Sequence, residues 1–496
     1  MKTLNIHIEN SQAKLYLKIS NAIRNSIKEG NVKLGEKLPS ARSLAEQLSV
    51  NRHTVMAAYN ELVAQGWVET KQRQGYRVTL TLPIYNSLSQ QSMPYCPSEK
   101  HQWRVIKKGQ ASFPRVASDY AFNFAGGNPD IELFPFNEFR GFVNDALNRP
   151  SIKELNYGEN SGFRPFINEV STYLRRVRSV IDKEIIVVNG TQEALYILSQ
   201  VLLEKGDKVA VENLGYKPAW QALKNAGAEL VGIKQTEQGI DVEHLEEMMQ
   251  INHIKLLYLT PLHQYPTTTT LPLANRVKIY QLAQQYQIPI IEDDYDHEFH
   301  YSSQPLPPLA ANDPAGLVIY LSSFSKIMFP GIRLGVIAVD KTLAKHIISY
   351  RTLMNHKASV LPQDAVARWM RDGGFERHLR KSTRTYQQRR KHMVDILNSF
   401  IEEGIRIEFT IPKGGMALWI NVGKNAQEIA NKASERGIFM LAENAFHLDT
   451  ANNQDKFLRL GFAGQNEENI KQGLLLLKPL LDQNNSSSAT FLSSVD

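Results

Sequence analysis

From Asp119 onward, short apolar runs alternate with segments of helical periodicity, and this alternation limits most strongly how the chain can fold. The runs end in polar or glycine-rich turns and lie at residues 185–188, 209–211, 256–259, 288–291 and 318–321. Short apolar runs between helices are typical of buried parallel strands. The sequence therefore predicts an α/β domain with a mostly parallel central sheet over residues 119–483, with a smaller α+β part from about His356.

The residues before Asp119 predict a separate domain. The chain has 496 residues, which is more than one typical domain needs. Residues 12–80 show three segments of helical periodicity followed by a hairpin pattern, as in a winged helix-turn-helix. Residues 81–118 are rich in Ser, Gln and Pro and lack periodicity, which predicts a linker. The Ser-rich residues 484–496 predict a disordered tail.

Positive charge is concentrated near the start of the chain. The net charge is +7 overall, but residues 1–80 carry +6, residues 81–118 carry +4, and the remainder carries −3. A basic head on a mildly acidic body indicates a polyanionic partner for the head. A basic surface can also be merely solvated, so charge alone does not identify that partner.

The sequence predicts a cytoplasmic protein without a membrane partner. No apolar run is long enough to span a bilayer, and charges appear too early at the start for a secretory signal. Cys96 is the one cysteine, so the chain cannot form an internal disulfide. A reducing compartment fits this composition.

Lys326 lies among small hydroxyl residues in Ser-Ser-Phe-Ser-Lys, and Arg333 follows in Pro-Gly-Ile-Arg-Leu-Gly. A lysine amine can form a Schiff base with the aldehyde of pyridoxal phosphate (PLP). The hydroxyls of Ser323 and Ser325 and the Arg333 guanidinium can bind its phosphate. This stretch predicts a PLP site with Lys326 as the attachment point and predicts no metal.

Residues 40–66 show the pattern of a helix-turn-helix. Polar and basic residues stand where a groove-facing helix would begin, namely Arg42, Asn51, Arg52, His53 and Thr54. Arginine suits contacts to phosphate and guanine, whereas threonine and helix N-terminal amides suit phosphate. The pattern predicts binding to double-stranded promoter DNA.

The run from Leu38 to Val68, LPSARSLAEQLSVNRHTVMAAYNELVAQGWV, closely resembles the GntR family of bacterial transcription factors. The resemblance implies that Arg42, Arg52 and Thr54 contact DNA and that the wing near Gly75 enters the minor groove. Arg73 and Arg77 are weaker candidates, because wing arginines are often only solvated.

Residues 120–480 resemble the fold type I PLP enzymes of the aspartate aminotransferase superfamily. Besides the lysine stretch, the resemblance is carried in order by NGTQE at 189–193, ENLGY at 212–216, IIEDDY at 290–295 and FLRLGF at 457–462. It implies the following roles: phosphate binding at Gly190, Thr191 and Gln192, ring stacking by Tyr216, an acid for the pyridine nitrogen at Asp293 (Asp294 as fallback), a hydroxyl for the ring oxygen at Tyr295, and a carboxylate anchor at Arg459.

The same resemblance implies a homodimer, in which Tyr157 reaches the phosphate of the neighbouring subunit. The loop beside the ring is matched by His263–Pro266 (HQYP). Its continuation, Thr267–Thr270, lacks the glycine that is usual in this loop.

The two resemblances in this order are those of the MocR-type subfamily of GntR regulators, in which the aminotransferase-like domain is a sensor. The resemblance implies that an amino effector displaces Lys326, forms an external aldimine anchored by Arg459, and thereby changes DNA binding. An active aminotransferase with a DNA-binding appendage is the alternative, because every group of the half-reaction is present. A third hypothesis is that PLP itself is the signal.

The residues after Tyr216 bear on the effector. The GABA-responsive member of the subfamily uses a second arginine just after the stacking tyrosine, whereas Lys217 and Pro218 stand here. The sequence therefore argues against GABA and leaves other amino acids, taurine, a small dipeptide or PLP open.

Overall fold

The computed structural model describes two compact units, within residues 1–109 and 110–496. The described residues are Leu4, Ile6, 13–71, 75–82, 120–149, 152–156, 158–301, 305–423, 425–449 and 455–482. Tyr157, Arg73, most of the predicted linker and the predicted tail lie outside them. Among the described residues, no helix is long and apolar enough to cross a membrane.

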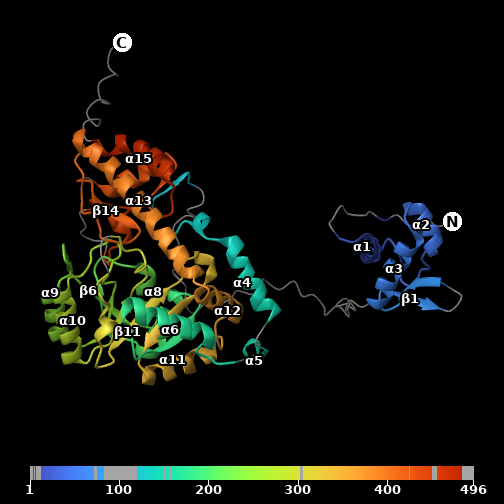
Figure 1. Cartoon of the computed structure of the whole chain (residues 1–496), viewed down its shortest axis with the longest axis horizontal. Coiled ribbons are helices and arrows are strands. Elements are labelled where there is room, and N and C mark those ends of the chain that lie inside the picture. The colour runs from blue at the N-terminus through green and yellow to red at the C-terminus, as the bar shows by residue number, and fades with distance from the viewer. Residues whose placement is uncertain are drawn as a thin grey trace, which may run out of the picture. The chain divides into compact units, whose positions relative to one another are not determined.

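The first unit is a three-helix domain with a two-stranded wing (Figure 1). Its elements are α1 (Leu15–Lys28), α2 (Ala41–Leu48), α3 (Arg52–Ala64), β1 (Val68–Lys71) and β2 (Gly75–Val78), with the strands antiparallel. Buried side chains from all three helices form its core, including Ile19, Ile23, Leu44, Val55 and Leu62. The predicted winged helix-turn-helix fold is confirmed.

Local chemistry fixes the helix ends in this domain. The Ser40 hydroxyl accepts a hydrogen bond from the Ser43 amide at 3.1 Å and caps α2. Ser49 ends that helix in a left-handed conformation with φ of 54°. Asn51 then caps α3 by accepting from the His53 amide at 2.9 Å. The short turn between the two caps sets the approach of α3 to α2.

A seven-stranded sheet forms the centre of the second unit. Its strands, in spatial order, are β4 (Glu184–Val188), β12 (Gly335–Val339), β11 (Val318–Ser323), β10 (Ile290–Asp293), β9 (Ile254–Leu259), β5 (Lys208–Glu212) and β6 (Glu229–Ile233). Only β12 runs antiparallel to its neighbours. Four of the five apolar runs of the sequence fall in β4, β5, β9 and β11, and the run 288–291 overlaps the start of β10, so the mostly parallel sheet is confirmed.

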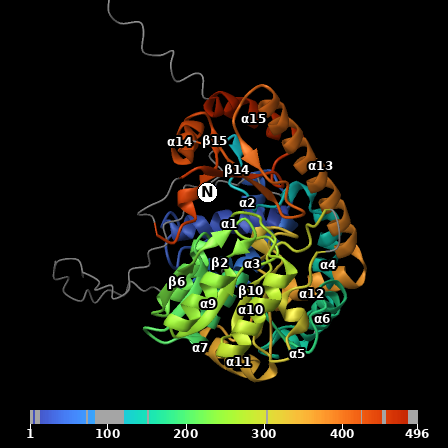
Figure 2. The same cartoon turned by 90° about the vertical axis from the view of Figure 1, so that its left-hand side faces the viewer.

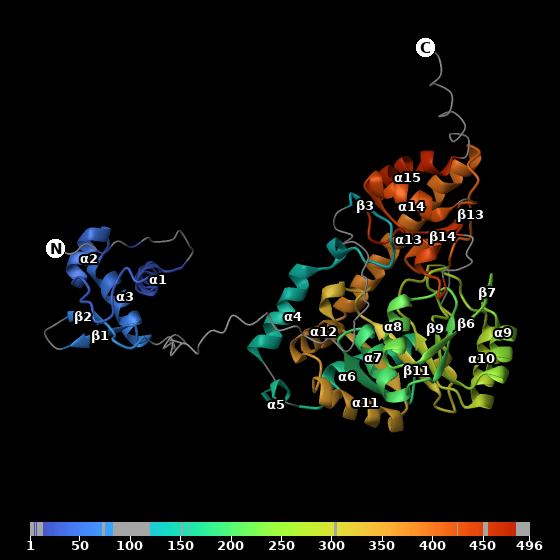
Figure 3. The ribbon, with the colours of Figure 1, turned by 180° about the vertical axis from the view of Figure 1, so that it is seen from behind.

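Helices cover both faces of this sheet (Figure 3). One face packs against α6 (Arg164–Arg178), α9 (Val242–Ile251), α10 (Leu273–Tyr286) and α12 (Val360–Arg371). The other packs against α7 (Thr191–Leu202), α8 (Lys217–Asn225) and α11 (Lys341–Met354). Strand side chains alternate between the layers, so that Val187 joins the first apolar cluster and Ile186 the second.

A second, smaller lobe adjoins the sheet lobe, and the long helix α13 (Gly374–Glu402) runs along both (Figure 2). Its antiparallel sheet has the order β13 (Glu408–Phe409), β14 (Ala417–Asn421), β17 (Phe457–Gly461) and β16 (Leu441–Ala442). Helices α14 (Ala426–Glu435) and α15 (Glu467–Leu481) cover it. A strand from the start of the unit, β3 (Phe122–Asn123), pairs in parallel with β15 (Ile438–Phe439).

The smaller lobe begins later than the predicted position near His356. The buried side chains of α12, such as Trp369, belong to the core of the sheet lobe, whereas the core of the smaller lobe begins on α13 at Tyr386. The remaining α-helices and strands of the described residues are α4 (Phe136–Asn148), which packs on α12, α5 (Ile152–Leu155), and the short pair β7 (Gln235–Thr236) and β8 (Gly239–Ile240). Four short 3-10 helices complete the unit, at Ile131–Leu133, Leu309–Asn312, Pro330–Ile332 and Glu443–Ala445.

Candidate cofactor pocket and DNA-binding surface

A pocket of about 230 Å³ lies where the parallel strands of the sheet end. This edge is the usual ligand site of open α/β sheets. The pocket brings together most of the residues predicted from sequence, namely Thr191, Gln192, Tyr216, Asp293, Tyr295, Ser323, Ser325, Lys326 and Arg333. Gly190 comes directly before the lining residue Thr191 in the chain, and Arg459 packs against the lining residue Gly126. Tyr157 lies outside the described residues.

The Lys326 amine is held inside this pocket. Its Nζ donates a hydrogen bond to the Gly127 carbonyl at 2.6 Å. Burial, together with the positive charge of Arg459, lowers the pKa of Lys326 to about 8. A lysine with such a pKa is partly unprotonated near neutral pH, which is the form that attacks an aldehyde.

Asp293 faces the pocket, and Asp294 does not. The Tyr258 hydroxyl donates to Asp293 Oδ2 at 3.0 Å, while Oδ1 is buried without a hydrogen-bond partner. Burial raises the pKa of Asp293 to about 7. Asp294 instead accepts from Arg178 at 2.7 Å and from the Tyr320 hydroxyl at 2.6 Å. Asp294, the alternative predicted from the sequence, therefore forms a buried ion pair with Arg178.

Tyrosines form a wall of the pocket. The Tyr216 and Tyr265 rings meet edge to face, with centroids 5.5 Å apart, and Tyr265 meets Tyr295 in the same way at 6.2 Å. The Tyr295 hydroxyl donates to the His263 carbonyl at 2.9 Å. Burial raises the pKa of Tyr216 above its usual value, so its hydroxyl stays protonated.

One end of the pocket is built to hold an anion. Gly190 precedes α7 with φ of 90°, and no side chain caps that helix, so its first amides are free to bind a charged oxygen. The Arg333 guanidinium lies beside this turn and donates to the Asn189 carbonyl at 2.8 Å. A Cβ at Gly190 would lie 2.8 Å from Arg333 Nη2, so glycine lets the arginine approach. Ser323 and Ser325 complete this end.

Arg459 is a buried cation on β17. Its side chain is about 1% exposed, and Nη1 donates to the Ala125 carbonyl at 3.2 Å. The guanidinium carbon lies 4.7 Å from the centre of the Tyr265 ring, whereas Nε has no hydrogen-bond partner. No carboxylate in the described parts of the chain forms an ion pair with it. An arginine held in this way favours an anionic ligand.

These observations fit PLP. The pocket offers an amine at Lys326, an unpartnered carboxylate oxygen at Asp293, a ring platform at Tyr216 and an anion cradle at Gly190 and Arg333. When bound, PLP supplies an electron-accepting ring, which works better while its nitrogen is protonated by a neighbouring acid. The residues present match each of these needs.

Five lining residues escaped the sequence analysis, namely Gly126, Gly127, Asn128, Tyr258 and Thr260. Gly126 and Gly127 lie against Arg459 and Lys326, and a Cβ at Gly126 would come within 1.9 Å of Arg459 Nη1. The adjacent glycines before Asn128 were the available signal. Tyr258 was hidden inside an apolar strand, and only the pairing of β9 with β10 places its hydroxyl on Asp293.

The threonine-rich loop also becomes interpretable. Thr268 has φ of 63°, in the left-handed region that favours glycine. Its amide donates to the Gln264 carbonyl at 2.7 Å, and the Gln264 amide donates to Thr269 at 2.9 Å. The loop thus keeps its turn without a glycine, at the cost of local backbone strain.

The predicted DNA contacts lie on the surface of the first unit. Arg42, Arg52 and His53 are exposed, and Thr54 is half-buried at the start of α3. Arg42 pairs with Glu46 at 3.1 Å on the surface of α2, an exposed contact that a phosphate can replace. Gly75 begins β2 with φ of 83°, which glycine adopts without strain.

Asn51 and the weaker candidate Arg77 also have structural partners. The Asn51 side chain caps α3, which leaves its amide nitrogen for a ligand. Arg77 donates to the Gly35 carbonyl at 2.9 Å and so links the wing to the chain before α2.

Fold and pockets define a DNA-binding winged helix joined to a PLP-binding domain of the aminotransferase type. Residues 15–78 match the family described as "Bacterial regulatory proteins, gntR family", and residues 142–475 match "Aminotransferase class I and II". The chain belongs to the MocR-type subfamily of GntR transcriptional regulators, and it is a PLP-dependent regulator.

The chain is similar both to transcriptional regulators and to aminotransferases. The chain is 31% identical over 395 residues, 78% of each chain, to the "Probable rhizopine catabolism regulatory protein MocR" of Rhizobium meliloti. It is 26% identical to the "Uncharacterized HTH-type transcriptional regulator YdeL" of Bacillus subtilis, over 94% of this chain and 96% of that one. Among solved structures, kynurenine aminotransferase of Pyrococcus horikoshii matches with a TM-score of 0.68 and 28% identity, over 73% of this chain and 91% of that one.

Proposed function

We propose that the PLP-binding domain senses a small amino compound that carries a carboxylate, and that its binding changes how the winged helix binds DNA. The observation that carries this proposal is Arg459, a buried guanidinium without a carboxylate partner in the described residues, next to the Lys326 amine. A ligand with an amine and a carboxylate satisfies both groups. Such a ligand switches DNA binding only if its affinity differs between the two states of the protein.

The roles within the pocket follow from chemistry and position. We assign attachment of PLP to Lys326, contact with the pyridine nitrogen to Asp293, and contact with the ring to Tyr216 and Tyr295. The phosphate would be held by Gly190, Thr191, Gln192, Ser323, Ser325 and Arg333, together with Tyr157 of a second subunit. Tyr258 is a positioning residue, because its hydroxyl fixes one oxygen of Asp293 and leaves the other for the ligand.

The DNA contacts are proposed from exposure and charge. Arg42, Arg52 and His53 present unburied donors near the start of α3, and the cap residue Asn51 and Thr54 adjoin them. Helix α3 would lie in the major groove, with the wing at Gly75 in the minor groove. Such contacts respond strongly to salt, because each phosphate contact releases a counterion.

A homodimer is supported by apolar side chains left exposed in the second unit. Leu147, Ile152 and Leu155 on α4 and α5 are 55%, 81% and 49% exposed, and Leu353 is 87% exposed. Large apolar side chains left in water favour burial against another protein surface. We propose that a second copy of the chain covers these side chains. We further propose that the dimer works in the cytoplasm, where promoter DNA is found.

An active aminotransferase is the second candidate, because Lys326, Asp293, Tyr295 and Arg459 are the groups of the half-reaction and lie together. A titration of the purified PLP-bound protein with a panel of amino compounds separates the candidates. A shifted visible band that persists, with a parallel change in DNA affinity, supports the sensor. Conversion of the cofactor to its amine form, reversed by a keto acid, supports the enzyme. A DNA affinity that responds to PLP alone would make PLP the signal.

The structure bears on the choice of effector. Lys217, which stands after the ring tyrosine, donates to the Asn444 carbonyl at 3.3 Å and does not line the pocket. A second carboxylate anchor at this position is therefore missing. We propose an effector whose single carboxylate is bound by Arg459.

A further inference from the structure

The long helix α13 has a basic outer face. Between Arg377 and Lys391, a stretch that the structure describes throughout, its exposed residues are Arg377, Arg380, Lys381, Arg384, Gln387, Gln388 and Lys391. All of them carry N–H donors, and the sequence has no Asp or Glu from Arg377 to Val394. They recur every three or four positions and so form one row, which we call the α13 strip. At 1.5 Å per residue the row is about 21 Å long.

Cations on the inward side of the same helix have partners in the fold. Arg389 Nη2 lies 2.7 Å from a carboxylate oxygen of Asp130. The half-buried Arg390 guanidinium lies over the Tyr301 ring, 4.6 Å from its centre. Packing of α13 therefore accounts for these two arginines, and it does not account for the strip.

The centre of the strip is left unpaired. Its two ends, Arg377 and Lys391, form surface ion pairs. The three cations between them, Arg380, Lys381 and Arg384, form no ion pair among the residues that the structure describes. Like charges three or four positions apart on a helix repel one another, so this arrangement slightly weakens the fold and favours an anionic partner.

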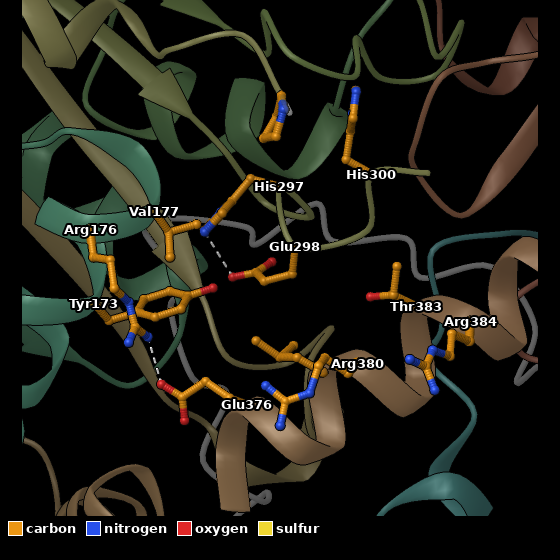
Figure 4. Close-up of a pocket in the computed structure, with 12 residues that line it drawn as sticks. Tyr173, Arg176, Val177, His297, Glu298, His300, Glu376, Arg380, Thr383 and Arg384 are labelled. Atoms are coloured by element: carbon orange, nitrogen blue, oxygen red, sulfur yellow. Dashed lines mark hydrogen bonds and ion pairs between the residues drawn. The ribbon is translucent and has the colours of Figure 1, made fainter. Parts of the chain in front are cut away.

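A hollow of about 440 Å³ adjoins the strip (Figure 4). Arg380, Thr383 and Arg384 line it from α13, and Arg176 lines it from α6. Arg176 pairs with Glu376 at 2.6 Å. The hollow shares no lining residue with the PLP pocket, so the strip is a separate surface of the same unit.

We propose that the α13 strip binds the phosphate backbone of duplex DNA, so that the second unit contacts DNA in addition to the winged helix. The proposal rests on DNA binding by the first unit, which raises the local concentration of a duplex for the rest of the chain. A duplex carries one negative charge for about every 1.7 Å of its axis, so a row of cations of this length meets several phosphates. Such contacts add affinity without reading the bases.

The composition of the strip favours DNA over other acidic partners. No large apolar side chain is exposed from Arg377 to Lys391, all of which lie in the described part of the chain. A helix that binds a membrane surface carries large apolar side chains beside its cations, and a protein interface has an apolar centre. Contacts to phosphate need neither, because charge and hydrogen bonds make them.

The first test measures DNA binding by the full-length, PLP-bound protein. The probe is a fluorescent duplex of mixed sequence, about 60 base pairs long, and anisotropy is recorded at several KCl concentrations. In the triple variant Arg380→Gln/Lys381→Gln/Arg384→Gln, affinity should fall about tenfold at about 100 mM KCl. The slope of log affinity against log salt should become shallower by about 2 to 3, since up to three phosphate contacts are lost.

A matched control removes the same charge elsewhere in the second unit. Lys205→Gln/Lys224→Gln/Lys255→Gln replaces three exposed lysines and should keep the affinity within about twofold of the wild type. Equal losses in the two triple variants, or no loss in the α13 variant, would overturn the proposal. So would an α13 variant that keeps its DNA affinity but no longer binds phosphatidylserine vesicles, because the partner would then be a membrane surface.

A second measurement detects the contact directly. Cys96→Ser/Arg384→Cys, labelled at position 384 with a photoreactive aryl azide, should crosslink to the duplex on illumination. The same label in Cys96→Ser/Lys255→Cys should not. A labelled protein that binds the duplex without crosslinking from position 384 would contradict the proposal.

The outcome separates the strip from the winged helix. If Arg52→Ala weakened binding and the α13 variant did not, the strip alone would fail and DNA binding by the first unit would stand. If the wild type bound no duplex at any salt concentration, both would fail.

Discussion

The DNA-binding surface and the PLP pocket hold charged groups in opposite ways. Arg42 and Arg52 of the winged helix stand in water, and their charges need no internal partner. Asp293, Lys326 and Arg459 are enclosed, and burial shifts the pKa of the first to about 7 and of the second to about 8. A surface that meets a polyanion can stay solvated until binding, whereas a pocket for a small ligand must keep charges buried beforehand.

The sharpest test of this contrast is Lys326→Ala. Because the amine is the one group able to hold PLP covalently in the pocket, the visible band of the bound cofactor should disappear completely. Absorption spectra of the variant and of Lys217→Ala, which should keep the band, provide the measurement. A band that persists would place the attachment at another lysine.

Asp293→Asn should reveal the energetic cost of the pocket. Because the pKa of Asp293 is raised, the folded PLP-free protein keeps a proton on this side chain at pH values where the unfolded chain has released it. The free energy of unfolding is therefore unaffected by Asp293 below about pH 4 and falls as the pH rises toward 7. The asparagine variant should therefore be more stable than the wild type at pH 8, by on the order of 4 kcal/mol, and about equal at pH 4. Urea unfolding of the PLP-free proteins measures both differences, and no gain at pH 8 would contradict the burial argument.

Arg459→Gln should remove the preference for carboxylates. The wild type should bind an amino acid about 100-fold more tightly than the matching amine, because two charge-assisted hydrogen bonds are lost without the carboxylate. The variant should bind both alike while retaining PLP. Spectral titration with L-leucine and 3-methylbutylamine measures the ratio, and an unchanged ratio would remove Arg459 from the effector site.

In the winged helix, Arg52→Ala should act on DNA alone. We expect operator affinity to fall about tenfold, with a smaller salt dependence, while stability and the PLP band stay unchanged. Fluorescence anisotropy at several salt concentrations measures this, and Lys14→Ala removes the same charge ahead of α1 as a control. Equal losses in both variants would mean that only net charge matters.

The smallest expected effect concerns the cap of α2. Ser40→Ala removes the hydroxyl that accepts from the Ser43 amide and should destabilise the first unit by about 1 kcal/mol. Thermal unfolding of the full-length protein should show this loss in the transition of that unit, with the pocket spectrum unaffected. A shift in the PLP band would show that the two units are energetically coupled.

Much of the fold could be predicted because its rules are local. The period of apolar residues gave the three helices of the first unit and five strands of the sheet, and Ser40 marked the start of α2. β6 and β12 were missed as strands. The later start of the smaller lobe was also missed, because only packing shows that Trp369 belongs to the core of the sheet lobe.

For the site, too, some features follow from local sequence and others depend on the tertiary structure. The sequence alone determined the residue types that PLP and DNA need, because Lys326, Arg333 and the start of α3 lie within short motifs. Only the tertiary structure decided between Asp293 and Asp294, since Arg178, which is 116 positions away in the chain, occupies one carboxylate and leaves the other to the pocket. It likewise placed Gly126 against Arg459. Such choices depend on which distant residues share a small space, and no local pattern records that.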